Sequence, residues 1–308
     1  MRVLITGSEG FIGKYLSEEF ERSGYDVVRC SFFDEEGYIQ LDIMNVKQVF
    51  DTIKMFAPDI IVNLAGQANV GLSWEKPQIT MELNIVGFIN ILEAVKKINS
   101  SIRIIGMGSS DEYGVLREKG VDVKENTPIN PINLYAVSKV AQEKVALLYN
   151  KTFDMNICMI RQFNLIGAGQ AKGFMVPDFA SGIVEVEIGK KPNLLVGNLE
   201  SARDFTYVKD AVKAIRLIAE KGHSGEIYNI CSGITYKTQD ILDKLLSLST
   251  KKIEVRKDSS KMRPSDTPVV CGNHDKLTAH TGWIPETSVD DVLVEVIDYW
   301  RKQLAANK

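Results

Sequence analysis

The chain has 308 residues, of which 44% are hydrophobic and 25% are charged, so it can bury a sizeable core. This composition excludes a mainly disordered protein. The formal net charge of −3 provides no basic field for a nucleic-acid backbone, and we therefore expect no nucleic-acid partner.

The first half of the chain alternates short β-branched runs with segments of helical periodicity, a pattern typical of parallel βαβ units. The predicted strands are Val3–Thr6, Asp26–Cys30, Ile60–Leu64, Ile102–Gly106 and Asn156–Arg161. The predicted helices are Phe11–Ser23, Val46–Phe56, Gln78–Ile98 and Leu134–Thr152. The pattern predicts an α/β protein with a Rossmann-type, doubly wound parallel sheet that is covered on both faces.

After about Gln162 the pattern changes to short elements separated by loops rich in Gly, Pro and Asn. Here we predict helix Val208–Lys221, strand Glu226–Ile230, and helices Lys237–Leu248 and Val289–Lys302. We expect a smaller α/β substrate lobe interleaved with the sheet. The sheet domain would comprise residues 1–163 and 204–231, and the lobe residues 164–203 and 232–308, with a cleft between them.

The cysteines and histidines give no metal or disulfide pattern. Cys30, Cys158, Cys231 and Cys271 form no C-x-x-C pair, and the three histidines have no metal-ligand spacing with them. We expect reduced thiols and no metal site. The first residues run directly into a strand and a glycine turn rather than a secretion leader, and no run of 18 apolar residues follows. We therefore expect a cytoplasmic protein with no membrane partner.

A glycine turn, Thr6-Gly7-Ser8-Glu9-Gly10-Phe11-Ile12-Gly13, follows the first predicted strand and opens the first helix. Its glycines can turn tightly, admit a pyrophosphate and let the helix pack on the strand, while free amides and the helix dipole face the phosphates. The spacing G-x-x-G-x-x-G differs from the commonest fingerprint, G-x-G-x-x-G, and a plain structural turn is the alternative. The context favours a dinucleotide site formed by Gly7, Gly10, Phe11, Ile12 and Gly13.

The end of the second strand decides between the two nicotinamide cofactors, because an acid there binds the adenosine ribose and repels a 2′-phosphate. The chain reads Arg29-Cys30-Ser31-Phe32-Phe33, and Asp34 comes too late. We expect NADP(H) or NAD(H) and favour NADP(H), although only Arg29 could select for it. Asp42 could accept from the adenine amino group or simply form a turn. The predicted cofactor-binding set also contains Ser31, Ile43, Leu64 and Ala65.

Tyr135 and Lys139 in Y-A-V-S-K lie four residues apart, on one face of a predicted helix. A nearby ammonium group stabilises a phenolate and lowers the tyrosine pKa, which makes the hydroxyl an acid or base. A solvated helix face is the alternative. Ser109 follows another predicted strand, at the sheet edge where ligands bind in doubly wound folds. Serine, tyrosine and lysine thus occur in the order that a hydride-transfer site requires.

With these motifs the chain resembles the extended short-chain dehydrogenase/reductase superfamily over almost its whole length. The segment V-G-N-L-E-S-A-R-D-F at residues 196–205 resembles GDP-mannose 4,6-dehydratases and GDP-4-keto-6-deoxy-mannose reductases. Y-N-I-C-S-G at residues 228–233, Arg263-Pro264 and Thr281-Gly282-Trp283 are more similar to the reductases.

The resemblance implies a catalytic set of Ser109, Tyr135 and Lys139. Of these residues, Tyr135 and Lys139 would also bind the cofactor. Asn84 would support this set, and Ser110 and Asp111 are possible accessory residues. Implied substrate contacts are Asn164, Val176, Asn198, Arg203 and Arg263. Independently of the resemblance, a net-acidic protein needs cationic side chains to bind a diphosphate, and an arginine can bind two of its oxygens at once. Arg203 and Arg263 could serve in this way, although either could form a structural ion pair.

The implied activity is NAD(P)H-dependent reduction of the C4 keto group of a nucleotide-activated 4-keto-6-deoxy sugar, with a GDP-sugar as the expected substrate. A 4,6-dehydratase or 4-epimerase that recycles its cofactor is the enzymatic alternative, and a dinucleotide-binding sensor or scaffold is the non-enzymatic one. The resemblance also implies a homodimer through Gln78–Ile98 and Leu134–Thr152.

The chain departs from the reductase pattern at several positions near the expected cleft. It has Leu165 and Ala168 where histidine and proline are common, and Tyr207 where aspartate is usual. It also has Asn63 and Gly66 where the strand normally ends in H-L-A-A. These departures leave the exact sugar and base open.

Overall fold

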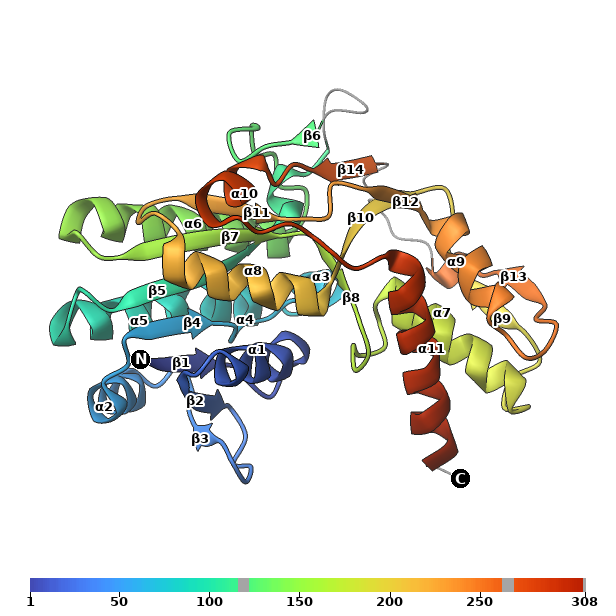
Figure 1. Cartoon of the computed structure of the whole chain (residues 1–308), viewed down its shortest axis with the longest axis horizontal. Coiled ribbons are helices and arrows are strands. Elements are labelled where there is room, and N and C mark those ends of the chain that lie inside the picture. Colours follow the sequence, from blue (N-terminus) through green and yellow to red (C-terminus); the bar gives the residue numbers. More distant parts are fainter. Residues whose placement is uncertain (116–121, 262–268, 307–308) are drawn as a thin grey trace.

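The computed structural model describes residues 1–115, 122–261 and 269–306. A larger lobe contains a seven-stranded sheet with the order β11-β7-β5-β4-β1-β2-β3, and a smaller lobe lies beside it (Figure 1). All pairings in this sheet are parallel. Its strands are β1 (Arg2–Thr6), β2 (Asp26–Ser31), β3 (Ile39–Gln40), β4 (Ile60–Asn63), β5 (Arg103–Ser109), β7 (Ile157–Gln162) and β11 (Ile227–Ile230). The predicted doubly wound sheet is confirmed.

The strand order reverses between β1 and β4, because β2 and β3 extend the sheet on one side and β4, β5, β7 and β11 extend it on the other. In such sheets, ligands bind outside the carboxyl ends of the strands at this switch point. The glycine turn follows β1, so the fold places it at the expected edge.

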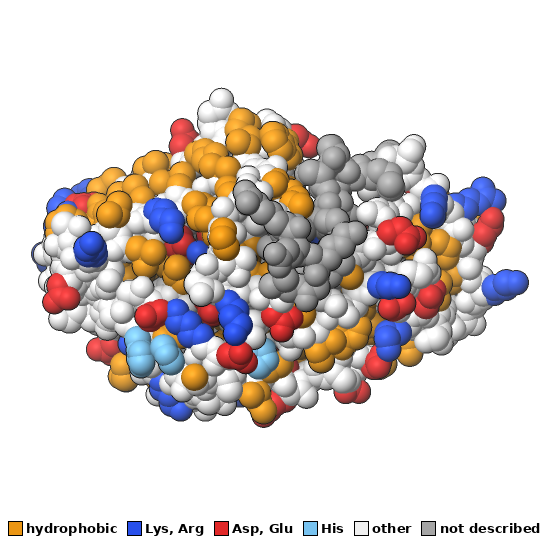
Figure 2. Space-filling model, turned by 90° about the horizontal axis from the view of Figure 1, so that it is seen from above, with side chains coloured by type: hydrophobic (Ala, Val, Ile, Leu, Met, Phe, Trp, Pro, Cys, Tyr) orange, Lys and Arg blue, Asp and Glu red, His pale blue; other side chains and the backbone are white. Residues whose placement is uncertain are grey.

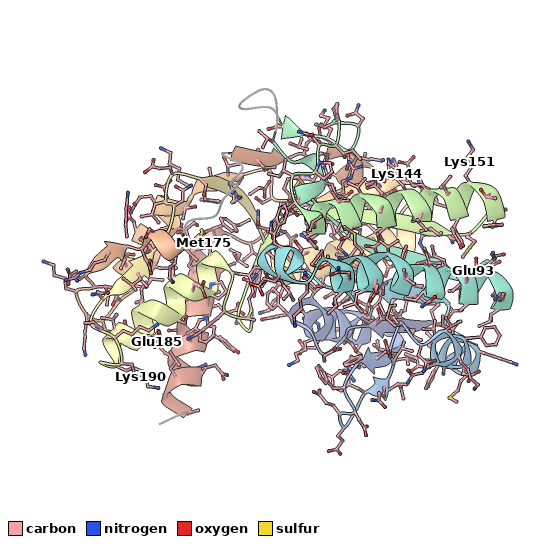
Figure 3. All side chains as sticks on the ribbon, turned by 180° about the vertical axis from the view of Figure 1, so that it is seen from behind. Glu93, Lys144, Lys151, Met175, Glu185 and Lys190 are labelled. Carbon is pink, nitrogen blue, oxygen red and sulfur yellow. The ribbon has the colours of Figure 1, made fainter. Side chains whose placement is uncertain are left out.

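Helices cover both faces of the sheet through apolar stripes of helical period. Helices α1 (Phe11–Arg22) and α8 (Val208–Lys221) pack together on one face (Figure 1). The other face carries α2 (Val46–Phe56), α5 (Gly87–Ile98) and α6 (Leu134–Phe153), of which α5 and α6 lie side by side (Figure 3). The predicted positions of α1, α2, α6 and α8 agree closely with the structure.

The predicted helix Gln78–Ile98 is not one regular helix. Helix α3 (Val70–Glu75) is followed by α4 (Pro77–Met81), a π-helical turn at Glu82–Val86, and α5. Hydrophobic periodicity does not reveal such a one-turn widening, which often occurs at functional sites. By length and composition alone, Pro77–Ile98 is long and apolar enough to cross a membrane, but half of its most apolar stretch is buried inside the protein, so this is weak evidence for a membrane span.

The smaller lobe contains two further sheets. Strands β6 (Asp122–Val123), β8 (Asn164–Ile166), β10 (Ala202–Tyr207), β12 (Thr235–Lys237) and β14 (Val269–Gly272) form one, and β9 (Leu194–Val196) pairs with β13 (Val255–Lys257). Helices α7 (Met175–Glu187), α9 (Thr238–Ser247) and α11 (Val289–Ala306) pack together in this lobe, whereas α10 (Asp275–Thr281) packs against α8 and β11 of the larger lobe (Figure 1). The chain returns to the large sheet for α8 and β11. The predicted division at residue 204 cuts β10, however, and β6 pairs with β14 rather than with the large sheet.

One cluster of buried hydrophobic side chains spans both lobes, whereas a second lies on the face of the large sheet that α2 and α5 cover. The cluster that spans both lobes joins Val3 of β1 and Ile105 of β5 to Ile183 of α7, Leu242 of α9 and Leu293 of α11. The four cysteines are unpaired, and all but Cys271 are buried. Because the cluster that spans both lobes is continuous and close-packed, it fixes the smaller lobe relative to the carboxyl edge of the large sheet.

Asp204, inside β10, holds three segments of the smaller lobe together. Its fully buried carboxylate accepts hydrogen bonds from the Ser232 backbone (2.8 Å) and hydroxyl (2.6 Å). It also accepts from the Gly233 and Gly272 amides, both at 3.0 Å. Asp204 thereby joins β10 to the turn after β11 and to β14.

We expect Asp204→Ala to lower the free energy of unfolding by at least about 3 kcal/mol, because several buried donors would lose their acceptor at once. Asp34→Ala removes an exposed carboxylate and is the matched control. Urea denaturation of both variants measures the difference. Equal stabilities would show that Asp204 does not hold these segments together.

Candidate active site

The glycine turn packs directly against the chain that follows β4. Gly7 has φ of +65°, and a Cβ there would lie 2.9 Å from the Ala65 amide nitrogen. A Cβ on Gly13 would lie 2.5 Å from Ser8 Cα. Only glycine satisfies both positions, so the turn and the start of α1 approach each other as closely as a pyrophosphate cradle requires. Gly10 is the N-cap residue of α1 and makes no side-chain capping hydrogen bond. The first backbone amides of α1 are therefore not capped by a side chain.

The other predicted cofactor residues surround this turn with different degrees of burial. Phe11, Ile12, Leu64 and Ala65 are partly buried beside it. The buried Ser31 hydroxyl accepts a hydrogen bond from the Phe33 amide, while Ile43 is buried in the core. Asp42 Oδ1 accepts a hydrogen bond from the Met44 amide at 2.9 Å. This bond forms a local turn, which was the alternative to a contact with adenine. These residues fit a dinucleotide, and their roles toward it stay predictions.

Ser109 ends β5 and caps the 3₁₀ turn Ser110–Tyr113. Its Oγ accepts a hydrogen bond from the Asp111 amide at 3.2 Å, and its side chain lies close enough to the Tyr135 hydroxyl to affect the pKa of the phenol. Tyr135 comes from the first turn of α6. Burial raises the pKa of Tyr135, the nearby Asp111 carboxylate raises it further, and the Ser109 side chain lowers it. The structure therefore brings the predicted serine and tyrosine together, with the phenol protonated.

Lys139 lies one turn further along α6, with its ammonium 5.9 Å from the centre of the Tyr135 ring. Its Nζ donates to the Met107 carbonyl at 2.7 Å and to Gln142 Oε1 at 3.0 Å. Burial lowers the pKa of Lys139 to about 8, and the charge of Glu112 opposes this shift. In this arrangement burial of the phenol is the largest influence, and the pKa of Tyr135 lies above its ordinary value. The predicted effect of the Lys139 ammonium on the tyrosine stays a prediction.

Asn84 sits in the π-helical turn and connects three segments around the predicted catalytic residues. Its Nδ2 donates to the Gln67 carbonyl and to Ser138 Oγ, both at 2.9 Å, and its Oδ1 accepts from the Gln67 amide. Ser138 lies between Tyr135 and Lys139 on α6. A Cβ on Gly66 would lie 2.6 Å from Asn84 Oδ1, which explains why the chain has glycine there. Asn84 thus positions α6 rather than touching Tyr135 itself.

A buried charge cluster behind this site was not predicted from the sequence. Glu112, Glu143 and Arg161 are each at most 2% exposed. Arg161 forms a bidentate ion pair with Glu143 (2.8 and 2.9 Å), and its Nε lies 3.7 Å from Glu112 Oε2. Glu112 Oε1 accepts the Ser109 amide at 2.8 Å. Glu112 directly follows Asp111 at a strand end, which is the only sequence signal that could have indicated it.

The predicted substrate residues are distributed unevenly. Asn164 of β8 donates to the Asp204 carbonyl at 3.5 Å and thus lies beside Arg203 of β10. Asn198 follows β9 and accepts from the Glu200 amide. Val176 is 2% exposed and belongs to the core, so its side chain does not face a cleft. Arg263 lies outside the described residues.

The departures from the reductase pattern have structural roles. Asn63 Oδ1 accepts from Thr6 Oγ1 at 2.7 Å and joins β4 to β1. Tyr207 donates to Glu295 and anchors α11 to the end of β10. Tyr15 donates to the Ala168 carbonyl at 2.9 Å. These contacts explain why the chain has these residues by their structural roles, and they do not identify the sugar.

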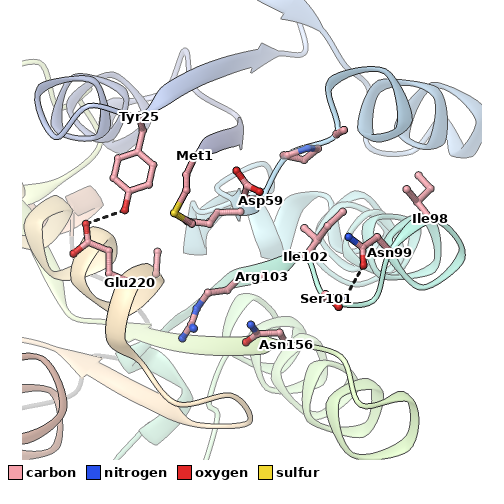
Figure 4. A pocket seen from close by; sticks show the side chains of 14 residues that line it. Met1, Tyr25, Asp59, Ile98, Asn99, Ser101, Ile102, Arg103, Asn156 and Glu220 are labelled. Atoms are coloured by element: carbon pink, nitrogen blue, oxygen red, sulfur yellow. Dashed lines mark hydrogen bonds between the residues drawn. The ribbon is translucent and has the colours of Figure 1, made fainter.

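A pocket of about 570 Å³ lies at the opposite, amino-terminal edge of the sheet (Figure 4). Its lining includes Met1, Asp59, Arg103 and Asn156. Ser109 lies at the carboxyl end of β5, whereas Arg103 lies at its amino end, so this pocket is separate from the candidate site. Among the described residues, no group of three or more His, Cys, Asp or Glu side chains is suited to hold a metal ion.

Comparison with known proteins identifies nucleotide-sugar enzymes. Residues 4–296 match the family model described as GDP-mannose 4,6 dehydratase. The chain is 29% identical over 304 residues to the GDP-6-deoxy-D-mannose reductase of Pseudomonas aeruginosa, covering 98% of each chain. The structure of RMD from Pseudomonas aeruginosa complexed with NADPH is 28% identical, with a TM-score of 0.89 over 98% of this chain and 99% of that one. The Thermus thermophilus UDP-glucose 4-epimerase complex with NAD is 25% identical, with a TM-score of 0.88 and the same coverage.

Burial of Lys139 predicts a specific dependence of stability on pH. Because folding lowers its pKa from 10.5 to about 8, the unfolded chain binds more protons than the folded chain between these pH values. The parent should therefore gain about 3 kcal/mol of stability relative to Lys139→Met as the pH rises through this range.

Denaturation curves across this pH range test the prediction. Lys144→Met removes an exposed lysine of the same helix and should follow the parent. A difference between parent and Lys139→Met that does not change with pH would contradict the buried-ammonium interpretation.

Proposed function

The chain belongs to the GDP-mannose 4,6-dehydratase family, within the extended short-chain dehydrogenase/reductase superfamily, and we propose that it is a reductase of this family. Its reaction would be NAD(P)H-dependent reduction of the C4 keto group of a nucleotide-activated 4-keto-6-deoxy sugar, with a GDP-linked sugar as substrate. The observation that carries this proposal is the placement of Ser109, at the end of β5, close to Tyr135 and the Lys139 ammonium of α6, at the sheet edge that holds the glycine turn.

When bound, the dinucleotide supplies the hydride. Tyr135 donates its proton to the C4 oxygen as the carbonyl becomes an alcohol, and its raised pKa keeps it protonated and ready to do so. Ser109 hydrogen-bonds the same oxygen, so two preset donors meet the developing charge. Lys139 stabilises the phenolate that Tyr135 leaves behind and donates to the nicotinamide ribose. This order of events leaves a 6-deoxyhexose on the nucleotide.

The smaller lobe supplies the proposed contacts to the nucleotide sugar. Arg203 and Asn164 lie on adjacent strands β10 and β8, next to the buried Asp204. A guanidinium is suited to the diphosphate because it can bind two oxygens at once, and Arg263 is the proposed second cation. Asn198 completes the proposed set.

A 4,6-dehydratase is the second candidate, favoured by one observation. The Asp111 carboxylate lies close enough to Tyr135 to raise its pKa, so a second acid or base is present beside the phenol. Dehydration requires such a group to remove a proton from C5. Aspartate is one methylene shorter than the glutamate of the dehydratase pattern, which favours the reductase. A 4-epimerase would use the same tyrosine with a recycled cofactor.

We also propose a cytoplasmic homodimer. Exposed apolar side chains follow the surface of the helices on one face of the large sheet, namely Trp74, Ile79, Val86, Val137, Leu148 and Phe153. In the view from above, hydrophobic side chains gather on the larger lobe, whereas charged ones are frequent along the rim of the smaller lobe (Figure 2). A second copy of the chain would bury this apolar face.

We expect Tyr135→Phe to lower kcat by at least about a thousandfold on a GDP-linked 4-keto-6-deoxy sugar, because the general acid is lost. The dissociation constant of the dinucleotide should change little. Tyr149→Phe alters a second tyrosine of α6, distant in sequence and bonded to Glu93, and should retain activity. Substantial turnover by Tyr135→Phe would rule out its role as the proton donor.

Leu148→Glu should weaken or abolish the dimer, because it places a charge on a side chain that is 61% exposed in the single chain. Ile284→Glu changes a side chain of similar exposure (54%) outside these helices and is the control. Sedimentation velocity measures both. A monomeric parent, or a Leu148→Glu variant that remains dimeric, would contradict the proposed interface.

A further inference from the structure

Glu9, in the middle of the glycine turn, is held against the end of β2. The preceding residue, Ser8, donates both its amide (3.0 Å) and its hydroxyl (2.8 Å) to the Cys30 carbonyl. The Glu9 carboxylate also lies close enough to Cys30 to raise the pKa of its thiol, after the larger effect of burial. Glu9 thus brings a carboxylate from the turn to the place where β2 ends.

The Glu9 carboxylate has unused hydrogen-bonding capacity at this place. Its Oε2 is buried and has no hydrogen-bond partner among the described residues. Leaving a buried carboxylate oxygen unpaired is costly unless a ligand donates to it. A ribose offers two neighbouring hydroxyl donors, whereas a 2′-phosphate offers only acceptors and about two negative charges.

The surrounding charges add to this effect. Arg29, the one cation that the sequence offered for a 2′-phosphate, is paired with Glu21 of α1 at 2.6 Å. The loop after β2 carries three consecutive exposed acids, Asp34, Glu35 and Glu36. A phosphate at the end of β2 would therefore meet negative charge without the guanidinium that NADP(H) sites use.

We propose that Glu9 is the specificity-determining residue of the dinucleotide site, which accepts a hydrogen bond from the adenosine ribose and selects NAD(H) over NADP(H). Glu9 replaces the acid that is missing at the end of β2. This proposal is the opposite of the sequence-based preference for NADP(H), and the titrations below decide between the two. Family membership does not decide the matter, because the similar structures include one with NADPH and one with NAD. The inference rests only on the dinucleotide-binding part of the proposed function.

Direct binding titrations of the full chain with NADH and with NADPH, followed by nicotinamide fluorescence and without sugar substrate, test this selection. The parent should bind NADH at least about tenfold more tightly, the discrimination expected when a carboxylate lies near a phosphate in a partly solvated site. Glu9→Gln keeps the shape but loses the charge, and should reduce the ratio of the two dissociation constants about tenfold. Glu18→Gln removes an exposed carboxylate further along α1 and should leave the ratio unchanged.

Each outcome has a distinct meaning. A parent that binds NADPH as tightly as NADH, or more tightly, would overturn the inference and leave the proposed reductase intact. An unchanged ratio in Glu9→Gln would assign the selection to other residues and overturn the role of Glu9. If neither dinucleotide bound, the inference and the proposed function would both fail. The parent measurement decides the first point even if the variants do not fold.

Discussion

The site depends on the burial of one ammonium group. Lys139 Nζ donates to the Met107 carbonyl at 2.7 Å and so docks helix α6 on strand β5. A charge in this position is tolerated only with compensating groups, and the fully buried Glu112 and the Arg161–Glu143 pair lie behind it. Glu112 also accepts the Ser109 amide, so the same cluster fixes the strand end that carries the serine. The residues that compensate the buried charge therefore also position the reacting groups.

Much of this arrangement could be predicted from the sequence, because it follows from local rules. Strands and helices of the first half have strong periodicity, and the glycine turn at residues 7–13 has a steric reason that the structure confirms at Gly7 and Gly13. The pairing of Ser109 with Tyr135 followed from strand order and helix spacing alone. Parallel sheets bring the carboxyl ends of successive strands to one edge, so residues distant in sequence meet there.

The remaining features depend on long-range contacts that no local pattern carries. The π-helical turn forms around Asn84 because its amide reaches Gln67 and Ser138, which lie on other segments. The elements of the smaller lobe that were not predicted, such as α7 and the short strands, gain their structure from the cluster of buried side chains that spans both lobes. The proposed role of Glu9 in cofactor selection likewise depends on a long-range contact, because the bonds from Ser8 to the Cys30 carbonyl bring the turn to the end of β2.

The central claim is that this chain transfers a hydride to C4 of a nucleotide-linked 4-keto-6-deoxy sugar and consumes the dinucleotide in doing so. The most direct test supplies NADH deuterated on the transferred position of the nicotinamide together with GDP-4-keto-6-deoxy-mannose. The account predicts one NADH oxidised for each GDP-6-deoxyhexose formed, with deuterium at C4 of the sugar. Sugar conversion without net oxidation of NADH, or dehydration of GDP-mannose itself, would contradict it and identify a cofactor-recycling member of the family.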